Sequence, residues 1–153
     1  MFCYGGIIMR YLDVEDLKIA TRFVFLSMAI TVLKQDLHYI QKGKFKIKEP
    51  YIFLIEQMIS LAVEQRRKLR KRMYALKLTV TRVRKNDLFT TYLFVCKRRE
   101  EERTYFNPVI RNKVKEIIFS LLNNVLQQYY KEIDHKRDAG ADRGFDVDMK
   151  TEP

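Results

Sequence analysis

Hydrophobic residues dominate three long stretches of the chain. The first, residues 14–41, lacks glycine and proline. Asp13, Glu15 and Asp16 favour a helix amino end at its start, and Gly43 closes it. Its central run, residues 23–33, is apolar almost all round, which a helix tolerates only when several neighbours cover it. We therefore predict a first helix at the centre of the core.

A second helix is predicted from Glu49 and Pro50, because proline is well tolerated in a first helical turn. One stripe at helical spacing runs along it, formed by Tyr51, Ile55, Met58, Ala62, Leu69 and Met73. Its second half, residues 66–72, places bases around Leu69, so we expect the helix to leave the core as it becomes basic. The linker before it, residues 42–48, alternates bases with small or apolar residues and also fits a short strand.

Beyond Met73 the pattern changes to β-branched and aromatic residues that alternate with polar ones. We predict a β-hairpin over residues 75–84 and 88–97, turning at residues 85–87. The alternative is that the second helix continues to Arg84, since no glycine or proline stops it. Residues 97–103 are expected to form a charged turn, in which Glu100, Glu101 and Glu102 are solvated rather than part of a metal or acid–base site.

The third helix is predicted to begin at Asn107 and Pro108, a pair that combines an N-cap side chain with a first-turn proline. Its expected buried stripe is Ile110, Val114, Ile117, Leu121, Val125 and Tyr129. Arg111, Lys113 and Lys115 lie off that stripe.

A chain of 153 residues is the size of one domain. We expect a leader of uncertain status at residues 1–8, with Met9 as an alternative start. A single helical domain then covers residues 9–133, and a disordered charged tail covers residues 134–153. The predicted fold class is mainly α (α+β), a three-helix core with one β-hairpin between the second and third helices.

The charge of the chain points to acidic partners. The formal net charge is +11, and residues 134–153 contribute six acids and four bases, so residues 1–133 carry +13. A surface this positive attracts polyanions through a long-range, salt-sensitive field. Nucleic acid, as DNA or RNA, is the leading polyanion, ahead of anionic lipid and an acidic protein.

No transmembrane segment is expected, because the most apolar window has eleven residues whereas a bilayer-spanning helix needs about 20. The opening residues carry their charge after the apolar stretch, unlike a secretory signal. With Cys3 and Cys96 as the only cysteines, a reducing cytoplasm fits best.

Catalytic chemistry is not indicated. His38 and His135 are the only histidines and have no cysteine, histidine or aspartate partners at ligand spacing. Cys96 lies in an apolar run, where a free cysteine acts as a small hydrophobe. There is no glycine-rich phosphate loop and no nucleophile elbow. We expect a protein that is not an enzyme, with no cofactor and no metal.

The pattern that stands out is a set of bases able to contact phosphates. It comprises Lys44, Lys46 and Lys48 of the linker, Arg66, Arg67, Lys68, Arg70, Lys71 and Arg72 of the second helix, and Arg82, Arg84 and Lys85 at the hairpin tip. A basic helix end followed by a basic hairpin is loosely similar to a winged helix, although the second helix is longer than a usual recognition helix. The alternative is that these charges form only a solvated surface.

The expected function is therefore a non-enzymatic accessory or regulatory protein that binds nucleic acid. The alternative is a helical protein-interaction module, a homodimer or an adaptor, whose wide apolar helix faces bury a partner. The aromatics Tyr105 and Phe106 would anchor such a partner or else cap the core. Attachment to anionic membrane through the lysine linker around Phe45 ranks third.

Three segments resemble the small YhjD-like proteins of Bacillus-type bacteria. They are the linker 43–51, the strand 89–94 and the start of the third helix, residues 105–114. None of the three is a catalytic signature. The resemblance implies a bacterial, cytosolic origin.

Overall fold

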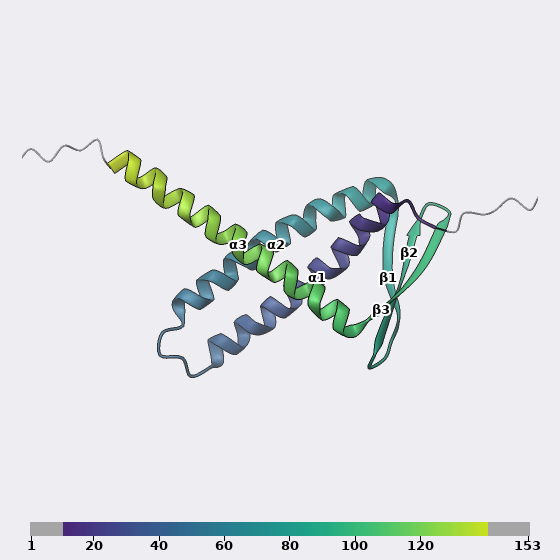
Figure 1. Ribbon diagram of the computed structural model, residues 1–153, viewed down its shortest axis with the longest axis horizontal. Helices are drawn as coiled ribbons and strands as arrows, with labels where there is room; N and C mark the ends of the chain where they lie inside the picture. The colour runs from purple at the N-terminus through teal and green to yellow at the C-terminus, as the bar shows by residue number, and fades with distance from the viewer. Residues whose placement is uncertain (1–10, 141–153) are drawn as a thin grey trace, which may run out of the picture.

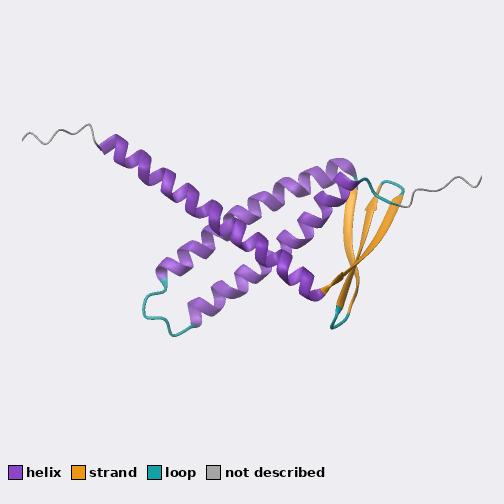
Figure 2. Cartoon of the chain, viewed as in Figure 1, coloured by secondary structure: helices purple, strands orange, loops and turns teal. Residues whose placement is uncertain are grey.

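The computed structural model describes residues 11–140, which form three helices and one antiparallel sheet (Figures 1 and 2). Along the chain these are α1 (Val14–Lys42), α2 (Glu49–Leu76), β1 (Leu78–Lys85), β2 (Phe89–Cys96), β3 (Arg99–Phe106) and α3 (Asn107–Gly140). The expected mainly helical α+β class is confirmed, with the β structure between the second and third helices. Within residues 11–140, no helix is long and apolar enough to span a bilayer.

The first two helices form an antiparallel pair joined by the loop of residues 43–48. The Asp13 side chain accepts a hydrogen bond from the Glu15 backbone N–H at 2.9 Å, which caps the start of α1. Gly43 ends α1, its N–H donating to the carbonyl of Tyr39 at 2.7 Å. The joining loop is irregular and contains no strand, so the strand alternative for the linker is wrong.

The alternative that α2 continues to Arg84 is also wrong. Lys77 follows the last helical residue with φ 54°, a left-handed conformation that ends a helix. The chain then enters β1, where Leu78 is buried against the core. Long-range pairing with β2 thus decides the structure of a segment whose local sequence allowed either state.

The sheet has three strands in the order β1-β2-β3, rather than the two of the predicted hairpin. The charged turn expected over residues 97–103 is wrong for most of its length, because only Lys97 and Arg98 turn and β3 begins at Arg99. Glu101 of β3 points inward and is buried. Its carboxylate accepts from the Leu12 backbone N–H at 3.1 Å and from Arg103 Nε at 2.6 Å, so the charge is compensated.

Two clusters of buried side chains make up the core. The first joins the inner face of the sheet to the start of α1 and the end of α2, and its fully buried centre is Phe94. The second lies among the three helices, with Leu26, Leu33 and Leu121 at its centre. Leu69 packs against both clusters and links them. Helix α1 contributes to both, as its apolar circumference predicted.

Helix α3 crosses the α1–α2 pair and extends beyond it (Figure 1). Val114, Leu121 and Val125 of the predicted stripe are buried, but Tyr129 is 53% exposed, because the helix has left the core by that point. Residues 134–140 of the predicted disordered tail are helical. The remainder of that tail and the leader of residues 1–8 lie outside the described residues.

Candidate functional site

The twelve bases predicted to contact nucleic acid do not form one surface. Lys44, Lys46 and Lys48 lie in the loop between α1 and α2, at the end of the helix pair away from the sheet (Figure 1). Arg66 lies eighteen positions after Lys48 along α2, which corresponds to about 27 Å of helix. The loop lysines are therefore remote from the other nine predicted bases.

The bases of α2 are partly engaged with neighbouring side chains. Glu64 accepts from Arg67 at 2.9 Å and forms a longer ion pair with Lys68 at 3.7 Å. The Arg67 hydrogen bond is the main reason that the pKa of Glu64 is lowered. Arg70 lies over the ring of Phe23 on α1, at 5.9 Å from its centroid. Arg66 is half-buried, while Lys71 and Arg72 are exposed along the same turns.

A bulge in β1 sends the hairpin bases to different faces of the sheet. The pairing register with β2 shifts between Arg82 and Arg84, so Arg82 pairs with Tyr92 and Arg84 with Thr91. Arg84 then donates to Glu102 of β3 at 2.6 Å. Arg82 lies instead on the face that looks toward α1, together with Lys85 at the end of the strand.

Arg82 and Lys85 line a groove of about 820 Å³ between the hairpin tip, α1 and the start of α3. Across it stand Arg111 and Lys115, one helical turn apart on α3. We call these four residues and the hollow between them the basic groove. Among the described residues, Asp87 is the one acid in its lining, and all four bases are exposed. Its apolar floor consists of Met28, Val32, Ile110, Val114 and Ile118.

Asn107 holds the two sides of the basic groove together. Its Nδ2 donates to the backbone carbonyls of Asn86 at 3.0 Å and Asp87 at 2.9 Å, and its Oδ1 accepts from Thr90 Oγ1 at 2.8 Å. Its backbone N–H donates to the carbonyl of Leu88 at 2.7 Å. The residue predicted as the cap of the third helix thus ties the hairpin turn to the first turn of α3.

A smaller hollow of about 410 Å³ extends the basic groove along α1 toward Phe23. The two hollows share Met28, Thr31, Arg82 and Tyr92 in their linings. Its far wall includes Phe23, and the guanidinium group of Arg70 on α2 lies over the ring of that residue. The basic end of α2 and the hairpin tip, predicted as parts of one site, are therefore connected across the surface of α1.

The sequence interpretation missed Arg111 and Lys115 as site residues. It placed both off the buried stripe, which is correct, but nothing in a local pattern shows that the first turns of α3 face the hairpin tip. Their spacing of four residues was the available signal, since it puts two bases on one helix face.

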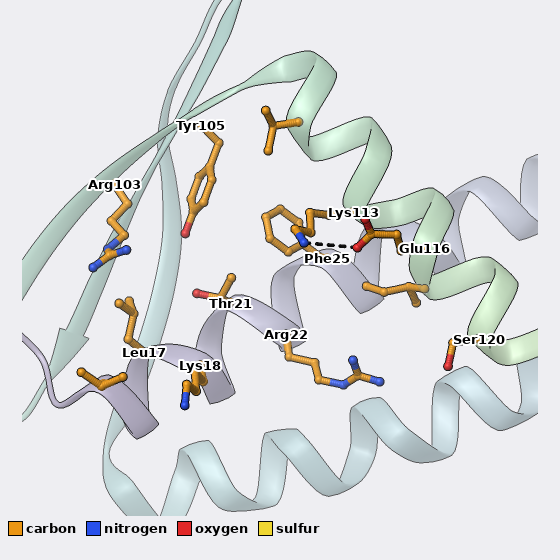
Figure 3. Close-up of a pocket in the computed structure, with 13 residues that line it drawn as sticks. Leu17, Lys18, Thr21, Arg22, Phe25, Arg103, Tyr105, Lys113, Glu116 and Ser120 are labelled. Carbon is orange, nitrogen blue, oxygen red and sulfur yellow. Dashed lines mark hydrogen bonds and ion pairs between the residues drawn. The ribbon is translucent and has the colours of Figure 1, made fainter.

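A second pocket, of about 600 Å³, lies on the other side of α1, against β3 and α3 (Figure 3). Phe25, Leu17 and Ile117 give it an apolar wall, and Phe25 meets Tyr105 edge to face with ring centroids 5.5 Å apart. Three of its cations are matched by glutamates: Lys18 with Glu15 at 2.8 Å, Arg103 with Glu101 at 2.6 Å and Lys113 with Glu116 at 3.2 Å. Compensated charges make this pocket less attractive to an anion than the basic groove.

The aromatics considered as partner anchors differ in their surroundings. Tyr105 is half-buried against Phe25 and Tyr92, so it caps the core. Phe106 is 43% exposed, and its ring lies tilted against that of Phe89 with centroids 5.5 Å apart.

The residues weighed for catalysis are not arranged as a reactive site. Cys96 is buried, and the single proton of its thiol lies within donating distance of two acceptors, the Asp16 carboxylate at 3.6 Å and the Leu76 carbonyl at 3.5 Å. Burial and then the hydrogen bond to Asp16 raise the pKa of the Cys96 thiol, which disfavours the nucleophilic thiolate. His38 is exposed on α1. Within residues 11–140, no three histidine, cysteine or acidic side chains gather at metal-binding distance.

Comparison with known proteins agrees with the resemblance noted in the sequence. A family model described as YhjD protein matches residues 11–126. The chain belongs to the YhjD family. An "Uncharacterized protein YhjD" of Bacillus subtilis (strain 168) is 34% identical over 110 residues, covering 72% of this chain and 92% of that protein. No solved structure matches.

The extent of the YhjD match relates directly to the site. It contains every residue that lines the basic groove, as well as Asn107. It ends within α3, so the final turns of that helix lie outside it. The relative is bacterial, which agrees with the origin implied by the resemblance.

Proposed function

We propose that this YhjD-family protein binds nucleic acid in the basic groove, as a non-enzymatic accessory protein of the bacterial cytoplasm. The observation that carries the proposal is the convergence of Arg82, Lys85, Arg111 and Lys115 on one hollow with a single acid in its described lining. A surface hollow that gathers four cations from two elements concentrates positive potential, which favours a polyanion over a singly charged ligand.

Most of the positive charge of the chain lies in the segment that contains the groove bases. Residues 66–115 contain seventeen bases and four acids, an excess of +13 that exceeds the net charge of the whole chain. This segment forms the basic half of α2, the sheet and the start of α3. The hairpin tip and the start of α3 line the basic groove, whereas α2 contributes no residue to its lining. A long-range positive field over this part of the molecule would attract a nucleic acid, and the groove offers it four of these bases together.

Three features of the basic groove suit contact with a nucleic acid. The four bases are exposed, so their long side chains can reach phosphates without first leaving a buried position. Asn107 fixes the hairpin against α3, so binding need not order the frame that presents them. The groove is lined by apolar residues beneath, which allow sugar and base faces to pack between the charged walls.

The test compares two charge-removing pairs with a matched control. Arg82→Gln with Lys85→Gln removes the hairpin wall of the basic groove, and Arg111→Gln with Lys115→Gln removes the α3 wall. Lys44→Gln with Lys46→Gln removes the same charge from the distant loop. Binding of each variant to single- and double-stranded DNA and RNA is measured at one low salt concentration.

The proposal expects both groove pairs to weaken binding to the preferred nucleic acid while the loop pair leaves it close to wild type. Equal losses from all three pairs would mean that binding follows net charge and has no site. No binding by the wild-type protein to any of the four nucleic acids would refute the proposed function.

A further inference from the structure

Within residues 11–140, no other helix or strand covers the end of α3. After Val125, the side chains of residues 126–138 are exposed except for Ile133, which is half-buried, and the helix projects past the other two (Figure 1, yellow end). Helices in water owe most of their stability to packing of an apolar face, and a short unpacked helical segment is marginal. Packing against a partner surface would therefore stabilise the projecting turns of α3.

The apolar residues of this segment follow a coiled-coil spacing. Alternating steps of three and four residues connect Phe119, Leu122, Leu126, Tyr129 and Ile133, which places them at the a and d positions of successive heptads. We call these five residues the α3 stripe. Phe119 is 55% exposed, Leu126 38% and Tyr129 53%, while Leu122 packs at the edge of the helical core.

The remaining positions of the projecting turns are polar, as a coiled-coil exterior requires. They are Gln127, Gln128, Lys131, Glu132, Asp134, His135, Lys136, Arg137 and Asp138, with Tyr130 as the exception. Lys136 occupies the d position after Ile133, so the apolar seam ends at Ile133. Because the other positions are polar, only the narrow face formed by the α3 stripe gains by being buried against a partner.

We infer that two copies of this chain pair through the α3 stripe as a parallel two-stranded coiled coil. Charge at the flanking positions selects this occupant and this direction. With the stripe at a and d, Glu132 occupies a g position and Arg137 the next e position. In a parallel pair, the g residue of one helix faces the e residue five positions later on the other.

Glu132 of each copy then meets Arg137 of the partner subunit, and twofold symmetry makes the ion pair twice. An antiparallel pair would bring g against g and lose this match. None of the five stripe residues lines the basic groove, so the pairing does not require bound nucleic acid. Tyr129 and Ile133 also lie beyond the YhjD match.

Analytical ultracentrifugation of the full chain without nucleic acid tests the pairing. The wild-type protein is expected to dimerise. Leu126→Asp, which puts a charge in the seam, should give a monomer, whereas Gln128→Asp, which adds the same charge on the exterior of the same turn, should remain dimeric. A monomeric wild type, or equal effects of the two variants, would overturn the proposal.

Charge reversal tests the direction. Glu132→Arg and Arg137→Glu should each raise the dimer dissociation constant about tenfold, since each places like charges together twice, and the double variant should restore it. A double variant that stays weak refutes the parallel arrangement.

A disulfide cross-link tests the same direction independently. In a Cys3→Ser background, Tyr129→Cys should oxidise to a disulfide-linked dimer, because d positions of parallel helices face each other. Failure to cross-link contradicts the parallel arrangement.

Discussion

The salt dependence of nucleic-acid binding gives the sharpest prediction about the basic groove. The perturbation is Arg82→Gln with Lys85→Gln, which removes the two hairpin bases and leaves Arg111 and Lys115 in place. Both substituted side chains are exposed, so the fold should be unaffected. The quantity measured is the slope of log Kobs against log salt concentration.

The size of the effect follows from the number of bases in the groove. If each of the four contacts one phosphate of duplex DNA, the slope is about −3.6, at about −0.9 per neutralised phosphate. Affinity should then fall about 150-fold between 50 mM and 200 mM salt. With two bases removed, the slope becomes about −1.8 and the same change of salt should cost about 12-fold.

Fluorescence anisotropy with a labelled duplex measures the slope at several salt concentrations, and Lys44→Gln with Lys46→Gln serves as the control. Thermal unfolding of each variant confirms that the fold is intact. A slope for the groove variant equal to that of wild type would refute the reasoning, because it would mean that Arg82 and Lys85 release no counterions. So would a loop variant whose slope falls by the same amount.

Three further predictions concern the sheet and the contacts that hold it in place. Asn107→Ala removes the side-chain hydrogen bonds to Asn86, Asp87 and Thr90. The backbone amides of the hairpin turn should then exchange with deuterium faster, while those at the centre of α1 exchange at the wild-type rate. Unchanged exchange in the turn would show that these bonds are dispensable. Glu101→Gln weakens the buried acceptor of the Leu12 N–H and the Arg103 side chain, and should lower the free energy of unfolding in urea by about 1.5–3 kcal/mol. The control Glu100→Gln, on the exposed face, should lower it by less than about 0.5 kcal/mol. Burial raises the pKa of the Cys96 thiol. In a Cys3→Ser background, the native thiol should therefore react with iodoacetamide at pH 8 far more slowly than the thiol of the unfolded chain, and the free energy of unfolding should fall as pH rises through the ordinary thiol range. Equal reaction rates in the two states would contradict this burial.

The helices could be predicted because their ends and faces are marked locally. Asp13 caps α1, Pro50 starts α2, and Asn107 with Pro108 opens α3 at the residue expected. The apolar run of α1 also indicated a central position, since no other environment covers a helix on all sides. Caps and periodicity are properties of neighbouring residues, so a single sequence carries them.

The third strand could not be predicted in the same way. The start of β3, Arg99 to Arg103, shows no apolar alternation, because it is an edge strand with an outer face open to solvent. Its inward residue is Glu101, an acid whose burial is acceptable only through partners distant in sequence, notably Leu12. A charged segment without tertiary context therefore resembles a turn.

The candidate site was predictable only in part, for a related reason. Arg82 and Lys85 were identified from their place at a hairpin tip, and the structure puts both in the basic groove. Arg111 and Lys115 join them because α3 folds back against the turn. The lysines at 44, 46 and 48 belong to the same sequence pattern but lie at the other end of α2. Local pattern shows that bases are exposed, whereas tertiary structure decides which of them meet.

The most direct test of nucleic-acid binding in the basic groove uses the lysines of the chain itself. Acetylation rates of individual lysines are measured by mass spectrometry with and without bound nucleic acid. Lys85 and Lys115 line the groove, while Lys44 and Lys46 are equally solvent-facing but remote. The account predicts strong protection of Lys85 and Lys115 and unchanged rates at Lys44 and Lys46. Protection of the loop lysines with free reaction in the groove would contradict it.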